Sequence, residues 1–121
     1  MLSSYDVLGG PQSSSLLFAT AKFRSENPKT YRAFISALGE AIDWINANKN
    51  GAAETYIRAE NSKLELSFIR GILNDPDIQF KLTPERIEVF SNFLHKIGAL
   101  KTKPASWRDV FFEDVSYLPG S

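Results

Sequence analysis

The residue types that usually carry out chemistry are few in this sequence and are not grouped. His95 is the only histidine among the 121 residues, and there is no cysteine. A general base or a metal ligand needs partners at a suitable spacing, and His95 has neither a second histidine nor a glutamate placed in that way. The remaining carboxylates of interest are predicted to be helix caps or solvated side chains, and they are Glu54, Glu60, Glu65, Asp75 and Asp77. We therefore predict no catalytic residue, no metal site and no cofactor.

A second group of residues could bind rather than react. Gln12, Ser13, Ser14 and Ser15 are uncharged hydrogen-bonding residues that directly follow Gly9-Gly10-Pro11. Paired glycines widen the accessible range of φ, and the proline then fixes φ and disfavours helix in the residue before it. Such a joint lets a chain change direction or cross between lobes. The alternative is an ordinary loop between two short strands, with serines that only solvate a strand start.

The two tryptophans could stack on a ligand, because an indole ring offers a flat apolar face. Trp44 lies next to an apolar helical stripe, and Trp107 follows a possible helix cap. For both residues we favour packing in the core or at its rim over ligand binding. The Gly9-Gly10 pair is not a phosphate loop, because the lysine and hydroxyl residue that complete such a loop are absent.

The overall composition narrows the classes of partner. The sequence has 14 basic and 14 acidic residues, 43% hydrophobic residues and 12% aromatic residues, values typical of a globular domain. A neutral chain gives no electrostatic reason to expect nucleic acid or an anionic membrane surface. No apolar run approaches the roughly 20 residues that span a bilayer. No export signal is visible at the N-terminus.

Apolar periodicity predicts a chain made mostly of helices. The clearest pattern runs from Pro28 to about Asn48, with apolar residues at spacings of three and four. Shorter helices are expected over residues 21–24 and 52–59, from a capping box at Ser62, over residues 83–98, and from Ser106. Short strands are expected over residues 2–8, 13–19 and 77–82. The prediction is therefore an α/β chain, mainly helical with two or three short strands.

Several segments together resemble the nitrate/sulfonate/taurine-type solute-binding proteins of ABC importers. The resemblance covers nearly the whole chain and looks like the C-terminal portion of such a protein. The segments that carry it include residues 6–11 (DVLGGP), 16–20 (LLFAT), 22–24 (KFR), 26–31 (ENPKTY), 74–78 (NDPDI), 83–86 (TPER), 103–107 (KPASW) and 118–121 (LPGS).

The resemblance implies a two-lobed periplasmic-binding-protein type II fold that closes over a small ligand. It implies that residues 1–20 form hinge or crossover strands and that residues 21–121 form a helical portion of the same single unit. Gly9, Gly10 and Pro11 become hinge candidates, and Gln12 and Ser13 become candidate ligand-binding residues. The ligand would be a small organic sulfonate, a nitrate-like anion or a thiamine-precursor pyrimidine, delivered to a membrane permease.

The same resemblance implies a periplasmic or extracytoplasmic protein whose export signal precedes this chain. Most of the ligand site would then lie outside the chain, and exposed apolar helix faces would make the chain self-associate. Two alternatives remain open. One is a self-contained small helical interaction module. The other is an enzyme similar to thiamine-pyrimidine synthases, which would need a lysine-bound cofactor and histidines that this sequence lacks.

Overall fold

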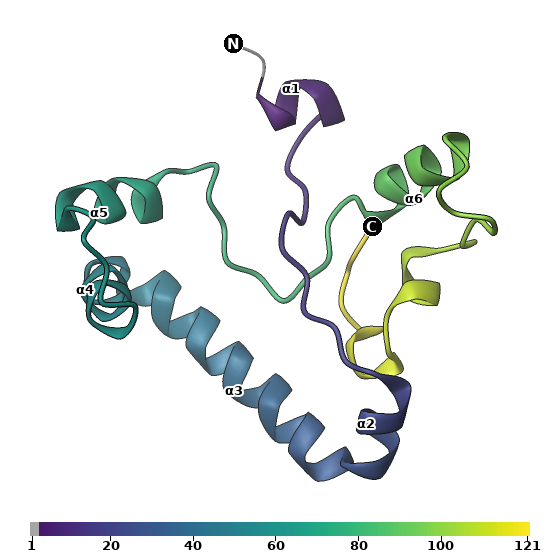
Figure 1. Cartoon of the computed structure of the whole chain (residues 1–121), viewed down its shortest axis with the longest axis horizontal. Coiled ribbons are helices and arrows are strands. Elements are labelled where there is room, and N and C mark those ends of the chain that lie inside the picture. Colours follow the sequence, from purple (N-terminus) through teal and green to yellow (C-terminus); the bar gives the residue numbers. More distant parts are fainter. Residues whose placement is uncertain (1–2) are drawn as a thin grey trace. The chain divides into compact units, whose positions relative to one another are not determined.

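The computed structural model of the chain describes residues 3–121 (Figure 1). These residues form six α-helices, two 3₁₀-helices and no strand. The helices are α1 (Ser4–Leu8), α2 (Ala21–Glu26), α3 (Pro28–Ala47), α4 (Lys49–Ala59), α5 (Leu66–Asn74), α6 (Ile87–Lys96), η1 (Trp107–Val110) and η2 (Glu113–Val115). The predicted α/β class with two or three strands is therefore wrong for the part of the chain that the structure describes.

The chain divides into two compact units. Unit 1 contains residues up to Leu17 together with residues 82–121, and unit 2 contains residues 18–81. Unit 2 is thus inserted in unit 1, and the chain passes from one unit to the other twice. The described part of residues 1–20, predicted as hinge or crossover strands, instead contains α1 and an irregular segment.

Unit 2 is a series of helices in which each contacts the next in sequence. Figure 1 shows α3 as its longest helix, with α2 at one end and α4 and α5 at the other. Pro28 lies in the first turn of α3, where its missing N–H leaves no helical hydrogen bond unmade. The helix predicted from Pro28 to about Asn48 is confirmed. The helix predicted after Thr20 is also confirmed, and the Thr20 hydroxyl accepts a hydrogen bond from Phe23 N–H at 3.0 Å.

Asn48 both ends α3 and begins α4. Its side-chain oxygen accepts a hydrogen bond from Gly51 N–H at 3.0 Å, which caps the new helix. The helix predicted over residues 52–59 therefore starts earlier, at Lys49. The most extensive helix contact of unit 2 joins α4 to α5, where Ala53 and Ile69 are buried. Arg70 of α5 forms a salt bridge with Glu54 of α4, with 2.7 Å between Arg70 Nη2 and Glu54 Oε1.

The capping box predicted at Ser62 does not form. The Ser62 hydroxyl accepts a hydrogen bond from Leu64 N–H at 3.3 Å, only two residues ahead, and α5 begins later, at Leu66. A hydroxyl used in this local turn is not available to the backbone three residues ahead. Consequently Leu64 lies outside the helix. Leu64, Phe68 and Ile72, the apolar residues that a helix starting at Ser62 would bury, are exposed.

Unit 1 is built around α6 and the C-terminal segment. We predicted that its helix starts at Thr83, but it starts at Ile87 because Arg86 adopts a left-handed backbone conformation with φ of 57°. The far end follows the prediction, and Gly98 has the positive φ, 78°, typical of a helix-ending glycine. The predicted cap at Ser106 is confirmed. Asp109 accepts from Ser106 N–H at 3.0 Å, and a 3₁₀-helix follows.

The first predicted strand, residues 2–8, is a helix in its described part, and Leu2 lies outside the described residues. Ser3 and Asp6 form a reciprocal capping box, and Gly9 ends α1 with φ of 76°. Both are helix signals that outweigh the weak alternation of Tyr5 and Val7.

The other two predicted strands have no partner. Residues 13–19 are irregular and largely exposed, with Phe18 at 97%. In residues 77–82, Ile78 N–H donates to Asp75 C=O at 3.1 Å in a turn, and the Phe80 carbonyl accepts from the Asn46 side chain at 3.0 Å. A strand needs a second strand to pair its backbone, and residues 3–121 provide none.

Candidate functional site

The predicted hinge residues lie in unit 1, at the end of α1. Gly9 N–H and Gly10 N–H both donate to the Tyr5 carbonyl, at 2.8 and 3.0 Å. Gly9 has φ of 76° and Gly10 has φ of 139°, values that a residue with a side chain rarely adopts. Pro11 follows and is exposed. The glycine pair therefore makes a tight turn that leads the chain into the polar segment.

Ser13 is joined to Glu85 by two hydrogen bonds. Ser13 N–H donates to the Glu85 carbonyl at 3.0 Å, and the Ser13 hydroxyl accepts from Glu85 N–H at 3.0 Å. The second bond is partly buried, which increases the cost of losing it. The structure thus gives Ser13 a clear role in pairing the polar segment with the residues that precede α6.

Gln12 is half-buried beside this contact. Its side-chain oxygen is inaccessible to solvent and has no hydrogen-bond partner among the described residues. Buried polar atoms are almost always paired, so an unpaired one requires an explanation. One explanation with chemical content is that the amide oxygen accepts a hydrogen bond from a bound molecule.

Arg86, which we did not predict as a site residue, lies against the glycine turn. A Cβ atom at Gly9 would be 3.0 Å from Arg86 Nη2, and one at Gly10 would be 3.4 Å from Arg86 Nη1. The absence of a side chain at both glycines therefore leaves room for the guanidinium group. Within residues 3–121, Arg86 Nε is buried without a hydrogen-bond partner. No salt bridge to Arg86 is found in that part of the chain.

We call Gly9, Gly10, Gln12, Ser13 and Arg86 the Arg86 cluster. It combines a cationic donor and a neutral acceptor, each with a buried atom that lacks a partner. A guanidinium group binds carboxylate, sulfonate or phosphate oxygens through a planar fork of N–H donors. The cluster is therefore the candidate binding site of unit 1. Its one hydroxyl, that of Ser13, accepts a hydrogen bond from Glu85 N–H at 3.0 Å.

The C-terminal segment fixes the backbone of the cluster. The Ser121 hydroxyl accepts from Arg86 N–H at 3.1 Å, and the Ser121 carbonyl accepts from Ile87 N–H at 2.7 Å. Figure 1 shows the C-terminus beside the start of α6. Ser121 N–H also donates to the Pro84 carbonyl at 3.1 Å. These contacts hold Arg86 in its left-handed conformation.

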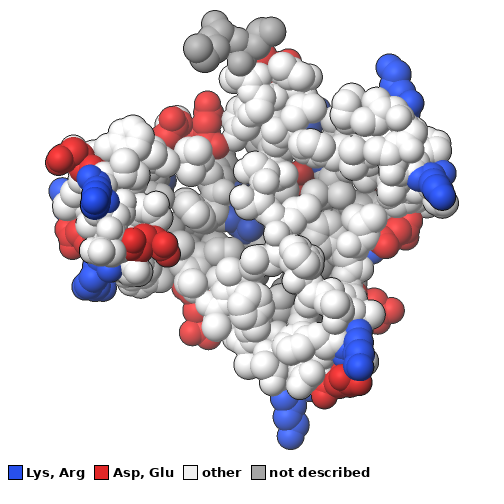
Figure 2. All heavy atoms as spheres, viewed as in Figure 1, with Lys and Arg blue, Asp and Glu red and all other residues white. Residues whose placement is uncertain are grey.

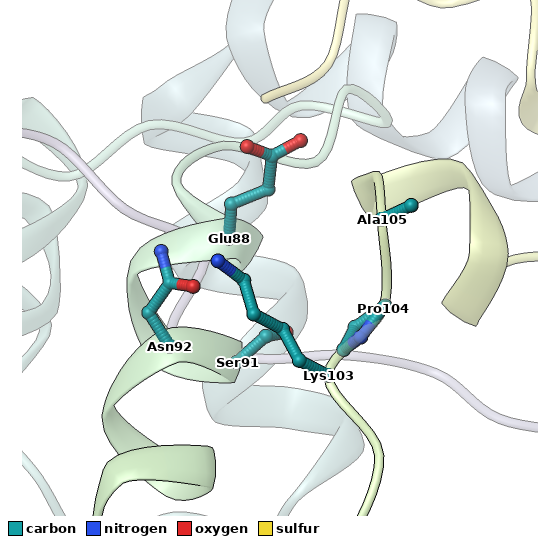
Figure 3. Close-up of a pocket in the computed structure, with 6 residues that line it drawn as sticks. All are labelled: Glu88, Ser91, Asn92, Lys103, Pro104 and Ala105. Carbon is teal, nitrogen blue, oxygen red and sulfur yellow. The ribbon is translucent and has the colours of Figure 1, made fainter.

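A hollow in unit 1, away from the Arg86 cluster, does not have the features of a ligand site. It encloses about 240 Å³ including open solvent, less than the roughly 300 Å³ of the smallest typical ligand pockets. Figure 3 shows the Lys103 side chain extending toward Glu88 and Asn92. A Glu88 oxygen accepts from Trp107 N–H at 3.2 Å, so this carboxylate has a structural role.

The other residues considered from the sequence have structural positions. His95 is exposed near the end of α6, and its Nδ1 lies 2.9 Å from the Leu100 carbonyl. Trp107 is only 2% exposed, so packing is confirmed for this residue. Trp44 is 45% exposed, and its packing stays a prediction. The described residues contain no group of three or more potential ligands that could hold a metal ion.

Sequence reasoning missed Arg86 and Ser121 for different reasons. Thr83-Pro84-Glu85 has the pattern of a helix start, so Arg86 was placed in the first helical turn. Arginine gives no local signal for a positive φ, unlike glycine or asparagine. Ser121 acts across 35 positions of sequence, which no short-range pattern can indicate.

Charges of both signs are mixed over α4 and α5 on the face drawn in Figure 2. No helix in the described part of the chain combines the length and apolar character that a bilayer crossing requires. No protein-family model, curated protein or solved structure matches this chain.

Proposed function

We propose that this chain is part of the solute-binding component of an ABC importer. In this proposal it captures a small organic sulfonate, a nitrate-like anion or a thiamine-precursor pyrimidine outside the cytoplasmic membrane and passes it to a permease. The chain corresponds to the C-terminal portion of that component and acts without catalysing a reaction. Residues elsewhere in the component supply the rest of the ligand site.

The observation that carries the proposal is the buried, unpartnered side-chain oxygen of Gln12. Gln12 and Ser13 are the two residues that the family resemblance assigns to ligand binding. A buried acceptor without a partner costs free energy, and a ligand N–H or O–H group would remove that cost. The two passages of the chain between its units also support the proposal, because two-lobed binding proteins connect their lobes more than once.

The test is a titration of the isotope-labelled chain, followed by proton–nitrogen NMR. The probes are methanesulfonate, nitrate and an aminopyrimidine, each compared with sodium chloride at equal ionic strength. We expect at least one probe to shift the Gln12 side-chain amide and the Ser13 backbone amide. If none of the three shifts these signals, Gln12 and Ser13 do not contact the solute, and the proposal loses the observation that carries it.

A matched pair of variants sharpens this test. Gln12→Leu should weaken binding of the aminopyrimidine, the probe whose N–H groups can donate to the Gln12 oxygen, by about 10-fold, the cost of one hydrogen bond to a buried group. Gln79→Leu is the control, because Gln79 is exposed and its amide nitrogen donates only locally, to the Pro76 carbonyl. Equal effects of both substitutions would mean that Gln12 has no specific role.

A second candidate is the self-contained helical interaction module, favoured by exposed apolar side chains on the helices. Phe68 of α5 is 56% exposed, and Phe93 and Ile97 of unit 1 are also exposed. Such surfaces usually contact another protein segment. In the transport proposal they contact the rest of the binding protein, and the chain alone self-associates.

Sedimentation velocity combined with denaturation separates the two candidates. Concentration-dependent association of the chain is expected from the transport proposal. A monomer that unfolds in one cooperative transition at every concentration would favour the independent module.

A further inference from the structure

We infer that Asn50 is a site of spontaneous covalent modification, at which the side-chain amide is lost whenever the first turn of α4 opens, and that the Asn48 cap protects it. Asn50-Gly51 is the only place among the 121 residues where asparagine precedes glycine. The inference does not depend on the proposed transport function, because it concerns a helix of unit 2 and not the Arg86 cluster.

The reaction uses the backbone of the chain as nucleophile and water as the second reactant. The Gly51 nitrogen attacks the side-chain carbonyl carbon of Asn50, the new N–Cγ bond closes a five-membered imide, and the Cγ–Nδ2 bond breaks. Nδ2 leaves as ammonia and takes up the proton that the Gly51 nitrogen loses. Water then adds to either imide carbonyl, which gives aspartate or, when the backbone runs through the side-chain carbon, isoaspartate. Glycine favours the first step because it has no side chain to obstruct the approach.

The folded first turn of α4 prevents this reaction. Asn50 is exposed there, so water reaches its side chain. Ring closure, however, needs a ψ at Asn50 outside the helical range. The Gly51 N–H group is also engaged, because it donates to the Asn48 side-chain oxygen at 3.0 Å. The Asn48 carbonyl accepts from Ala52 N–H at 2.9 Å, which fixes the same turn. Asn50 therefore becomes reactive only when these two hydrogen bonds open.

The Asn48 cap also explains why the reactive pair is present. A Cβ atom at position 51 would lie 2.9 Å from Asn48 Cγ, a distance too short for a van der Waals contact. Any residue other than glycine would displace the Asn48 side chain and weaken the cap. Gly51 thus serves the folded helix, and the same glycine makes the open turn reactive.

The two products change α4 in opposite directions. Aspartate places a negative charge in the first turn, which the helix dipole favours, and α4 has no acidic residue there. Isoaspartate adds a carbon atom to the backbone and interrupts the hydrogen-bonded rings of that turn. Because α4 contacts α5 where Ala53 and Ile69 are buried, isoaspartate at position 50 should loosen this contact.

The test compares the rate of modification in the folded and the unfolded full chain. The wild-type chain is incubated in mildly alkaline buffer, with and without a denaturing concentration of urea. At intervals it is digested with trypsin, and mass spectrometry follows peptide 50–58, which contains no other asparagine. We expect aspartate and isoaspartate at position 50 in both samples, formed at least about 10-fold more slowly without urea because the turn must first open. Equal rates in the two samples, or no conversion in urea, would overturn the inference.

Variants of Asn48 show whether its cap sets the rate. Asn48→Ala removes the acceptor for Gly51 N–H and should speed the conversion in the folded chain by about 2- to 30-fold, the usual effect of losing an N-cap. Asn48→Asp keeps an oxygen acceptor and should leave the rate nearly unchanged.

Thr20→Ala is the control for general destabilisation, because it removes the cap of α2 instead. If Thr20→Ala speeds the conversion as much as Asn48→Ala does, the protection does not come from the Asn48 cap and the inference is overturned. The wild-type comparison does not depend on whether the variants fold.

Discussion

The contacts within unit 1 differ in kind from the contacts within unit 2. In unit 2 each helix packs on the next one in sequence, from α2 through α5, with Tyr31, Ala53 and Ile69 buried. In unit 1, Ile87 and Trp107 are buried, and hydrogen bonds also join segments far apart in sequence, such as Ser13 with Glu85 and Ser121 with Arg86. Unit 2 therefore depends on packing between helices adjacent in sequence, whereas unit 1 adds to its apolar packing long-range polar contacts that converge near Arg86. The candidate site lies in the unit with the long-range contacts.

The largest expected effect comes from the buried tryptophan of unit 1. Trp107→Ala should cost about 3–5 kcal/mol, because the indole is 2% exposed and the Gly120 backbone packs against it. We expect amides of α6 to lose protection from hydrogen exchange while those of α3 and α4 keep it. Trp44→Ala, at a residue that is 45% exposed, is the control and should have a small effect. Equal loss of protection in both units would show that they unfold together.

A reciprocal substitution perturbs unit 2. Ile69→Ala should cost about 2–4 kcal/mol, because Ile69 is buried where α5 contacts α4. The expected result is faster hydrogen exchange in α4 and α5, with no change at α6. Ile78→Ala, in the same unit but at an exposed residue, should change little. Loss of protection at α6 in the Ile69 variant would contradict the separation of the two units.

A smaller loss of stability is expected when the hydrogen bond between Glu85 N–H and the Ser13 hydroxyl, which positions the cluster, is removed. Ser13→Ala removes the acceptor for Glu85 N–H and should cost about 1–2 kcal/mol, because that bond is partly buried. Denaturant unfolding measures the loss, and NMR of the Arg86 Nε–H group measures whether the cluster is disturbed. Ser14→Ala, at an exposed position, is the control. An Arg86 Nε–H signal that is unchanged in the Ser13 variant would mean that the Ser13–Glu85 hydrogen bond does not position the cluster.

The smallest effect is a pH dependence confined to α1. Hydrogen bonds from Ser3, first from its backbone N–H and then from its hydroxyl, lower the pKa of Asp6 below its ordinary value of 3.8. Because the folded pKa is lowered, the stabilisation is complete above the unfolded pKa and is lost as the pH falls through the folded value. We expect amide shifts of residues 4–8 to report fraying below about pH 4 and not above it. Asp6→Asn should abolish this transition. Its persistence in that variant would assign the transition to another group.

The same contrast explains which parts of the fold could be predicted. The helices of unit 2 follow from spacing and capping residues close in sequence, so α2, α3 and most of α4 agree with the predictions. The strand predictions failed because strands need partners, and alternation alone does not provide them. The Ser3–Asp6 capping box and Gly9 are sequence signals for α1 that the strand prediction for residues 2–8 did not take into account.

The candidate site could be predicted only in part. Gln12 and the glycine pair stand out in the sequence because of their residue types and order. Arg86 does not, because its contact with Gly9 and Gly10 depends on the path of the chain between α1 and α6. The conformation of Arg86 depends on Ser121, a residue that no local pattern connects with it.

The central claim, that this chain belongs to an extracytoplasmic solute-binding protein, is tested most directly by the natural protein in its source cell. An antibody against the chain would give both its intact mass and its compartment. We predict a mass well above the 13.6 kDa of this chain, in the extracytoplasmic fraction. A mass near 13.6 kDa in the cytoplasm would contradict the claim.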